Sequence, residues 1–292
     1  RRGIAIDMRA VVDLVVTRAA ELWGLVERQD VTWVHRPEDL SAFSRGAGPG
    51  EPVRLQRRLD AAGVTDSVPL ADRKPEWLRP KVRLGDEVMK VKSTLRDLEL
   101  VTVCEEAGCP NLSECWKDGT ATFMVLGERC TRACGFCLVD TQKPLQPADD
   151  EPARVAAAVA AMGLEHAVLT MVARDDLDDG GFAHVARCVE AIRDRVPGTR
   201  VETLVSDAKG DDRSLQLLFD ARPDVFNHNI ETVARLQRAV RPSAGYARSL
   251  GVLARAKDAG LVTKSGLVLG MGETTEKSTG AWPISRPSAS RS

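Results

Sequence analysis

The stretch 120–140, TATFMVLGERCTRACGFCLVD, contains the pattern that decides both the fold and the chemistry. Its first eight residues (120–127) are apolar and rich in strand-forming side chains, so they are predicted to form a β-strand. Three cysteines with the spacing Cys-x3-Cys-x2-Cys follow directly, at Cys130, Cys134 and Cys137. A four-iron cube normally takes four cysteine ligands. A loop that supplies three leaves one iron open for a reactive ligand, as a catalytic zinc keeps one position open.

A second triplet, Cys104-x4-Cys109-x5-Cys115, lies just upstream within VCEEAGCPNLSECW. The alternatives to two iron–sulfur sites are a structural zinc site and a set of disulfides. Zinc normally takes four ligands in two pairs, and neither triplet supplies them. Disulfides are disfavoured because the seven cysteines are an odd number and no secretory signal pattern is present. The seventh cysteine, Cys188, falls inside a predicted helix and is expected to be a small buried apolar residue.

From residue 120 onward, strand-like and helix-like segments alternate. The predicted strands are 120–127, 166–172, 200–207, 224–230 and 261–270, and the predicted helices are 151–163, 182–196, 212–221 and 246–260. Repeated βα units predict a parallel sheet with right-handed crossovers. In such folds the functional side chains lie at the carboxyl ends of the strands. The second cysteine triplet, the acidic loop RDDLDDGG (174–181) and Asn229 all occupy such positions.

The Cys-x3-Cys-x2-Cys loop followed by βα repeats resembles the radical S-adenosylmethionine (SAM) enzymes. The upstream triplet narrows the resemblance to the lipoyl synthase family, and the similarity covers about residues 73–276. The stretches that carry it are RKPEWLRPKV (73–82), the segment from the first triplet to the second, RDDLDDGG (174–181), DVFNHNIETV (224–233), RPSAGYARSL (241–250) and TKSGLVLGMGET (263–274).

The resemblance implies an α/β fold, an open parallel (β/α) partial TIM-type barrel of the radical SAM kind, with five of six strands legible. It implies two 4Fe–4S clusters and SAM as cofactors. Cys130, Cys134 and Cys137 would hold the cluster that cleaves SAM. An auxiliary cluster, consumed as the sulfur source, would bind to the other triplet, which is Cys104, Cys109 and Cys115. The implied reaction inserts two sulfur atoms at C6 and C8 of a protein-bound octanoyl-lysine.

The resemblance also implies partners and further site residues. The partners would be an octanoylated lipoyl carrier domain or H-protein, a ferredoxin- or flavodoxin-type reductant, and iron–sulfur assembly factors. Arg174, Asp175, Glu202 and Asn229 are candidates to bind SAM. Each has a structural alternative: the acidic loop could be only solvated, and Glu202 could be a satisfied barrel carboxylate. His228 is open between contact with SAM or substrate and a hydrogen-bonded structural role.

Composition bounds the remaining expectations. The net charge of 292 residues is −1, which gives no sign of a nucleic-acid or anionic-membrane surface. No apolar run reaches membrane-spanning length, so a cytoplasmic location is expected. The expected organisation is an N-terminal extension of unknown role with an amphipathic helix and a Gly/Pro-rich linker (1–70), an auxiliary-cluster segment (71–119), the radical SAM partial barrel (120–276) and a disordered tail (277–292).

Some positions depart from the family pattern. Met171 and Ala173 replace a Ser and an Asp after the second strand, and the family's C-terminal Arg-Ser-Ser-Tyr motif, whose serine is a cluster ligand, is absent. Two alternative hypotheses therefore stand beside lipoyl synthase. One is an inactive, truncated relative that binds only iron–sulfur. The other is a different radical SAM sulfur-inserting enzyme, such as a biotin synthase-like protein.

Overall fold

The computed structural model describes residues 58–64, 86–98, 100–103, 112–137, 139–268 and 271–273. Cys104 and Cys109 of the upstream triplet lie outside the described residues. So do most of the predicted N-terminal extension and the predicted disordered tail (277–292). Within the described part of the chain, no helix has the length and apolar character needed to cross a membrane.

A six-stranded sheet runs in sequence order from β1 to β6. Its strands are β1 (Val101–Thr102), β2 (Thr120–Val125), β3 (His166–Met171), β4 (Arg200–Leu204), β5 (Val225–Asn227) and β6 (Val262–Lys264). Strands β2 to β6 are all parallel, which confirms the five predicted strands. The two-residue β1 pairs antiparallel with β2, and it is too short to carry a periodic sequence signal.

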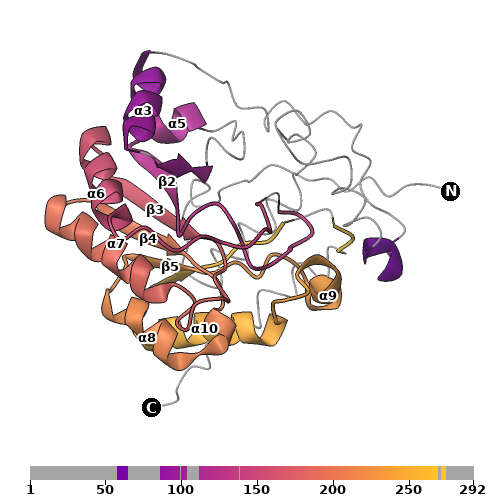
Figure 1. Cartoon of the computed structure of the whole chain (residues 1–292). Coiled ribbons are helices and arrows are strands. Elements are labelled where there is room, and N and C mark those ends of the chain that lie inside the picture. The colour runs from indigo at the N-terminus through magenta and orange to yellow at the C-terminus, as the bar shows by residue number, and fades with distance from the viewer. Residues whose placement is uncertain are drawn as a thin grey trace.

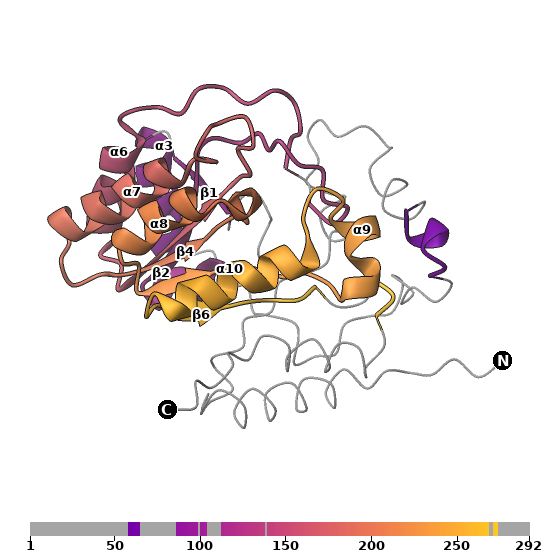
Figure 2. The ribbon, with the colours of Figure 1, turned by 90° about the horizontal axis from the view of Figure 1, so that it is seen from below.

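Helices connect the parallel strands and cover one face of the sheet, as Figure 1 shows. These helices are α6 (Glu151–Met162), α7 (Phe182–Arg195), α8 (Asp212–Asp220) and α10 (Tyr246–Asp258), and all four were predicted from the sequence. Three more helices, α3 (Asp86–Asp97), α5 (Leu112–Lys117) and α9 (Gln237–Val240), were not predicted. Figure 2 shows α9 apart from the other labelled helices, and the architecture is an open α/β partial barrel.

The main core lies between the sheet and these helices. Phe123, Leu169 and Phe226 are fully buried on the helix-facing side of their strands. Each such aromatic or leucine side chain stabilises the fold by about 1.5–3 kcal/mol on burial. Cys188 on α7 is also fully buried in this core, which confirms its predicted role as a small apolar residue. Burial raises the pKa of its thiol, as expected for an inert cysteine.

A second, smaller core ties residues far apart in the sequence to α9. Its buried members are Leu59, Val64, Val233, Leu236, Val240 and Met271. Phe136, between two cysteines of the triplet loop, packs against this core. Arg58 donates a hydrogen bond to the carbonyl of Ala133 in the same loop (3.1 Å). The second core therefore supports the cysteine loop from one side.

The chain leaves β2 through a left-handed turn. Leu126 has a φ of 71° and Gly127 a φ of 85°. The Leu126 N–H donates to the Glu151 carboxylate (2.9 Å), and its carbonyl accepts from the Arg174 guanidinium (3.2 Å). The Leu126 side chain lies against Gly181, where an added Cβ would stand 2.5 Å from Leu126 Cδ1. The turn that starts the cysteine loop is thus fixed through its backbone and its side chain.

We predict opposite stability effects for alanine at two glycines. Gly181 has a φ of 86° and contacts Leu126, so Gly181→Ala should lower the free energy of unfolding by about 1–3 kcal/mol. Gly251 lies inside α10, with nothing within 4 Å of an added Cβ. Gly251→Ala should therefore raise stability by about 0.5–1 kcal/mol. Thermal unfolding of both variants checks this, and a destabilised Gly251→Ala would contradict it.

Candidate active site

The three-cysteine loop lies at the carboxyl end of β2. The Cys130 N–H donates to the carbonyl of Asp140 (2.7 Å), which closes the loop into a ring of backbone. Cys130 and Cys134 are half-buried, whereas Cys137 is exposed. The predicted placement of the triplet at a strand end is confirmed.

The three thiols of the loop lie close enough to one another for their charges to interact. Among the residues that the structure describes, no group of three His, Cys, Asp or Glu side chains is arranged to hold a single metal ion. A four-iron cube takes each thiolate at a separate corner. Burial raises the pKa of the Cys134 thiol, the Cys130 thiol adds to the rise, and the charge of Arg241 opposes it. A bound metal centre would supply the positive charge that removes these protons.

Backbone hydrogen bonds fasten the loop to its surroundings at two further points. Thr131 donates to the carbonyl of Ala173 from both its N–H and its hydroxyl group, each at 2.9 Å. Gly135 donates its N–H to the carbonyl of Val240 at the end of α9 (2.8 Å). The loop therefore bridges the segment after β3 and the end of α9, which places the thiols between them.

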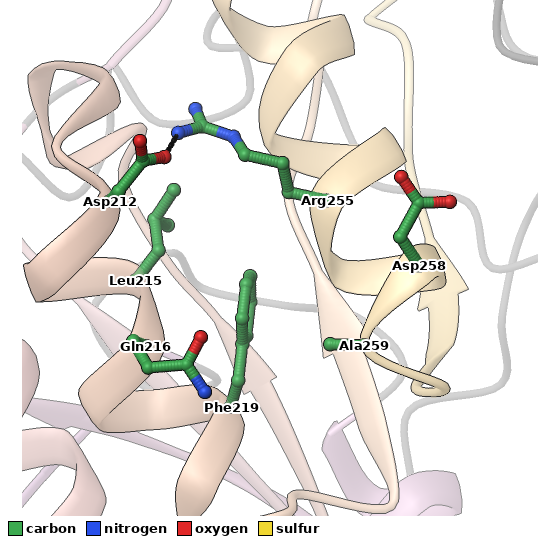
Figure 3. Close-up of a pocket in the computed structure, with 7 residues that line it drawn as sticks. All are labelled: Asp212, Leu215, Gln216, Phe219, Arg255, Asp258 and Ala259. Carbon is green, nitrogen blue, oxygen red and sulfur yellow. Dashed lines mark hydrogen bonds and ion pairs between the residues drawn. The ribbon is translucent and has the colours of Figure 1, made fainter.

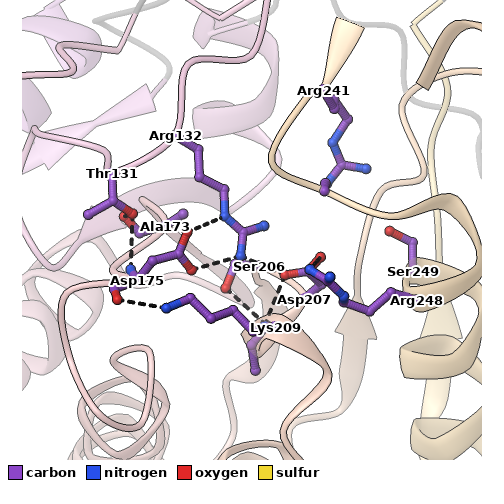
Figure 4. A network of polar contacts seen from close by, with 12 residues as sticks. Thr131, Arg132, Ala173, Asp175, Ser206, Asp207, Lys209, Arg241, Arg248 and Ser249 are labelled. Carbon is purple, nitrogen blue, oxygen red and sulfur yellow. Dashed lines mark hydrogen bonds and ion pairs between the residues drawn. The ribbon is translucent and has the colours of Figure 1, made fainter. Parts of the chain in front are cut away.

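A buried network of charged side chains centres on Arg132 (Figure 4). The Arg132 guanidinium binds both carboxylate oxygens of Asp175, at 2.7 and 2.8 Å, and one oxygen of Asp207, at 2.7 Å. The second oxygen of Asp207 accepts from Arg248 at 3.2 Å. Lys209 donates to the Asp175 carbonyl at 2.9 Å. One side chain of the cysteine loop is thereby linked to the loops that follow β3 and β4.

The charges in this network stabilise one another. Burial alone would raise the pKa of Asp207, but the hydrogen bond and charge of Arg132, with the charge of Arg248, lower it. Burial alone would lower the pKa of Arg132, and its two carboxylate partners outweigh that effect. Arg132 and Asp207 are therefore both charged at neutral pH, and these two buried ions compensate one another.

Arg241 is a cation that interacts with a thiol of the loop. It is buried, it interacts with the Cys134 side chain, and it donates to the carbonyls of Asn229 (2.9 Å) and Ile230 (3.3 Å). Burial raises the pKa of Glu231, and Arg241 and the Asn229 side chain oppose that rise. Asn229, one of the predicted SAM contacts, is thus brought to the cysteine loop through Arg241.

Glu202, another predicted SAM contact, lies in the middle of β4 and is buried. It accepts from Asn227 (2.8 Å) and Lys264 (2.9 and 3.2 Å) and contacts the His166 ring at 3.3 Å. Burial alone would raise its pKa, but its three partners outweigh this and lower the pKa to about 2. Glu202 is thus an ionised, fully partnered carboxylate, the structural alternative considered for it.

The acidic loop after β3 splits into two roles. Arg174 is fully buried, and its guanidinium binds Leu126 and both oxygens of Asp176 (2.9 Å each). This position favours a structural role over the predicted contact with SAM. Asp175 is bound by Arg132 and is partly exposed at the mouth of the site.

His228, whose role the sequence left open, is buried between the Val205 carbonyl (2.8 Å) and the Ser249 hydroxyl (2.9 Å). Burial lowers its pKa to about 4, so it is a neutral structural histidine.

Sequence reasoning missed Arg132, Asp207 and Arg241. A signal existed for two of them. Arg132 lies inside the cysteine motif, and Asp207 is the last residue of the stretch predicted as the third strand, where parallel folds place functional groups. Arg241 follows α9, a helix of four residues that carries no periodic signal, and so its proximity to Cys134 was not predictable.

A surface recess of about 310 Å³ lies between α8 and α10 on the helix side of the sheet (Figure 3). Leu215, Phe219 and Ala259 give it an apolar floor, and an ion pair between Asp212 and Arg255 crosses its rim. None of the predicted site residues lines it. The recess is therefore separate from the candidate active site.

Two parts of the chain match known protein families. Residues 124–278 match the radical SAM superfamily, and residues 58–109 match the N-terminal domain of lipoyl synthase of that family. The second match begins inside the predicted N-terminal extension, so residues 58–70 fall within it. Among solved structures, the chain has a distant likeness to methylornithine synthase, with a TM-score of 0.44 and 14% identity over 68% of this chain and 62% of that chain.

The curated relatives are lipoyl synthases. The one from Kineococcus radiotolerans is 52% identical over 77% of this chain and 66% of its own length. The one from Rubrobacter xylanophilus is 54% identical over 70% of this chain and 64% of its own length. The one from Mycobacterium tuberculosis is 49% identical over 76% and 71%, respectively. The chain thus spans about two thirds of the length of the curated relatives that it matches.

The Glu202 network predicts a defined acid sensitivity. The folded-state pKa, about 2, lies below the ordinary value of 4.5, so this carboxylate stabilises the fold fully above pH 4.5 and loses that contribution as the pH falls toward 2. Glu202→Gln should lower the free energy of unfolding at pH 7 by about 2 kcal/mol and flatten its fall between pH 4.5 and 2. Denaturant titrations at several pH values measure this. The exposed Glu190→Gln is the control, and an identical pH profile for both variants would contradict the assignment.

Proposed function

Because the chain belongs to the lipoyl synthase family of the radical SAM superfamily, we propose that it inserts sulfur at C6 and C8 of an octanoyl chain carried on a protein lysine. The observation that carries this proposal is the loop at the end of β2, which presents three thiols and no fourth ligand of its own. The alternative of another radical SAM sulfur-inserting enzyme is not favoured, because the N-terminal match is to lipoyl synthase. The same match and the curated relatives also leave the iron–sulfur-only alternative unfavoured.

The family's cofactors are SAM and two 4Fe–4S clusters, and the residues present fit one such cluster on the β2 loop. When bound, these groups supply a radical able to remove hydrogen atoms from an unactivated alkyl chain. Cys130, Cys134 and Cys137 would hold three corners of the cube. Arg241 would offset the negative charge of the Cys134 thiolate, and Phe136 would keep water from the loop side that packs on the second core.

The SAM contacts are proposals, and the surroundings of each candidate support some of them more than others. Asn229 is the best placed, because Arg241 connects it to the Cys134 side of the loop. Asp175 keeps unused lone pairs on the oxygens that bind Arg132, and it is partly exposed. Glu202 could reach a ligand only by exchanging one of its three partners, and Arg174 only by leaving Leu126 and Asp176.

The upstream triplet is proposed to hold the auxiliary cluster that gives up its sulfur. Cys115 lies on α5, and α5 packs against β2. This packing would keep the sulfur source next to the strand that leads to the other triplet. Cys104 and Cys109 would complete the set.

The proposed substrate is an octanoylated lipoyl carrier domain or H-protein, bound at the open ends of the strands. A ferredoxin- or flavodoxin-type reductant would deliver the electrons, and iron–sulfur assembly factors would load and renew the clusters. Cluster potentials extend down to about −700 mV, and the cleavage of SAM needs a cluster at the low end of that range, so the electrons must come from a low-potential external donor. We also propose a cytoplasmic location, where reduced thiols allow cluster assembly.

The two triplets should be separable by mutation. Replacing Cys130, Cys134 and Cys137 with Ala should remove about half of the iron loaded by anaerobic reconstitution and abolish the cleavage of SAM under dithionite. Replacing Cys104, Cys109 and Cys115 with Ala should remove the other half, leave the cleavage of SAM detectable and stop sulfur insertion. Iron analysis and chromatography of the cleaved SAM measure both. Persistent SAM cleavage in the first variant would refute the assignment of the β2 loop.

The proposed activity itself should be visible by mass spectrometry. With SAM, dithionite and an octanoylated carrier domain, the reconstituted chain should convert the octanoyl group to lipoyl, with two SAM molecules cleaved per product. The all-alanine variant of the β2 loop is the control. Cleavage of SAM with no sulfur added to any carrier domain would reject lipoyl synthesis as the activity of this chain and favour the inactive relative.

A further inference from the structure

Arg132 carries the only side-chain ion pairs that the described residues of the cysteine loop make with other loops of the barrel. It stands between Cys130 and Cys134, and 6% of it is exposed. Its three short hydrogen bonds reach Asp175 after β3 and Asp207 after β4. Charge-assisted, bidentate bonds of this kind define both position and orientation. The guanidinium is therefore anchored to two loops, which restrains the backbone between the two cysteines.

Asp207 is held in place by a strained turn. The next two residues, Ala208 and Lys209, have φ angles of 45° and 52°, a backbone conformation that residues other than glycine rarely adopt. In this turn the Lys209 N–H donates to Asp207 Oδ1 (3.1 Å) and the Gly210 N–H to the Asp207 carbonyl (2.7 Å). Strained backbone persists where surrounding contacts fix it, and such sites are concentrated where geometry serves function. Here the strain aims a fully buried carboxylate at Arg132.

The charges of the network form a closed set. Two guanidinium groups, Arg132 and Arg248, face two carboxylates, Asp175 and Asp207 (Figure 4). Removing Arg132 or Asp207 would leave the buried charge of the other without its closest partner, which is strongly unfavourable. The set is therefore stable only when Arg132 is bound to both carboxylates. The position of the bound Arg132 in turn defines where the thiols of Cys130 and Cys134 lie.

We propose that Asp175 and Asp207 are positioning residues that fix Arg132, and with it the flanking thiols of Cys130 and Cys134, in the ligand arrangement before the iron–sulfur cluster enters. The inference rests on the proposed binding of a cluster to the β2 loop, but it does not depend on sulfur insertion. It assigns to the acidic loop a role in assembling the site, in addition to any contact of Asp175 with SAM.

Hydrogen–deuterium exchange on the full, metal-free chain tests this directly. In Asp207→Asn and Arg132→Gln, amides of residues 129–137 should exchange at least about tenfold faster than in the parent chain, because the buried partner is lost. Arg132→Lys, which keeps the charge but not the fork, should fall between Arg132→Gln and the parent chain. Exchange in α7 serves as the internal reference for the fold. The double variant Arg132→Gln/Asp207→Asn should exchange no faster than the faster of its two single variants, because both substitutions break the same contact.

Cluster loading gives a second, independent readout. Reconstitution with iron and sulfide should load the β2 site several-fold more slowly in the same variants, and the electron paramagnetic resonance signal of the reduced cluster should broaden. Asp224→Asn breaks an exposed Asp–Arg pair beside the amino end of β5, away from the site, and is the matched control. Parent-like exchange at 129–137 in Asp207→Asn or Arg132→Gln, with α7 unchanged, would overturn the inference. Faster exchange in the variants together with no octanoyl conversion by the parent chain would support the inference while rejecting the proposed function.

Discussion

A guanidinium buried between two carboxylates is the contact on which the geometry of the candidate site depends. Arg132 joins the cysteine loop to the loops that follow β3 and β4, so three consecutive βα connections meet at one charged group. An arginine in this position needs both partners, because a buried charge with a missing partner costs several kcal/mol. The sheet supplies those partners at the right places because its parallel strands bring the ends of β2, β3 and β4 to the same edge.

The two faces of the sheet are used differently. The face toward the helices is a dry core of side chains such as Phe123, Val125 and Phe226. The other face carries ionic groups within the sheet itself, with Glu202 on β4 and Lys264 on β6 joined by a salt bridge. Alternation along a strand permits this, since successive side chains point to opposite faces. The fold thus keeps its stability on one face and leaves polar chemistry for the other.

The elements that the sequence predicted correctly share long, regular signals. Strands β2, β3 and β4 and helices α6, α7, α8 and α10 are regular elements with many buried apolar positions, and their predicted bounds differ from the observed ones by a few residues at most. The strand β1 and the helix α9 have two and four residues, and no periodicity can announce elements that short. The site at the end of β2 was predicted because the spacing of its cysteines can be recognised within one short stretch of the sequence.

The charged site residues were harder to predict for a different reason. Arg174 and Arg132 are both arginines near acidic residues, and only the tertiary structure reveals that the first supports a turn while the second joins three loops. His228 was equally ambiguous, since a histidine at a strand end can face a ligand or, as here, a serine and a carbonyl. Pairings over 75 residues, such as that of Arg132 with Asp207, depend on register and loop path that composition does not encode.

The backbone hydrogen bond between Cys130 and Asp140 has a consequence for how this region can change in length. It closes the cysteine loop before the exposed stretch 141–149 begins, and that stretch runs on to α6 along the surface. Extra residues inserted near the exposed Leu145 would extend a solvent-facing connection whose ends are already anchored. The chain can therefore vary there, or accept a fused peptide, while the spacing of the three thiols stays constant.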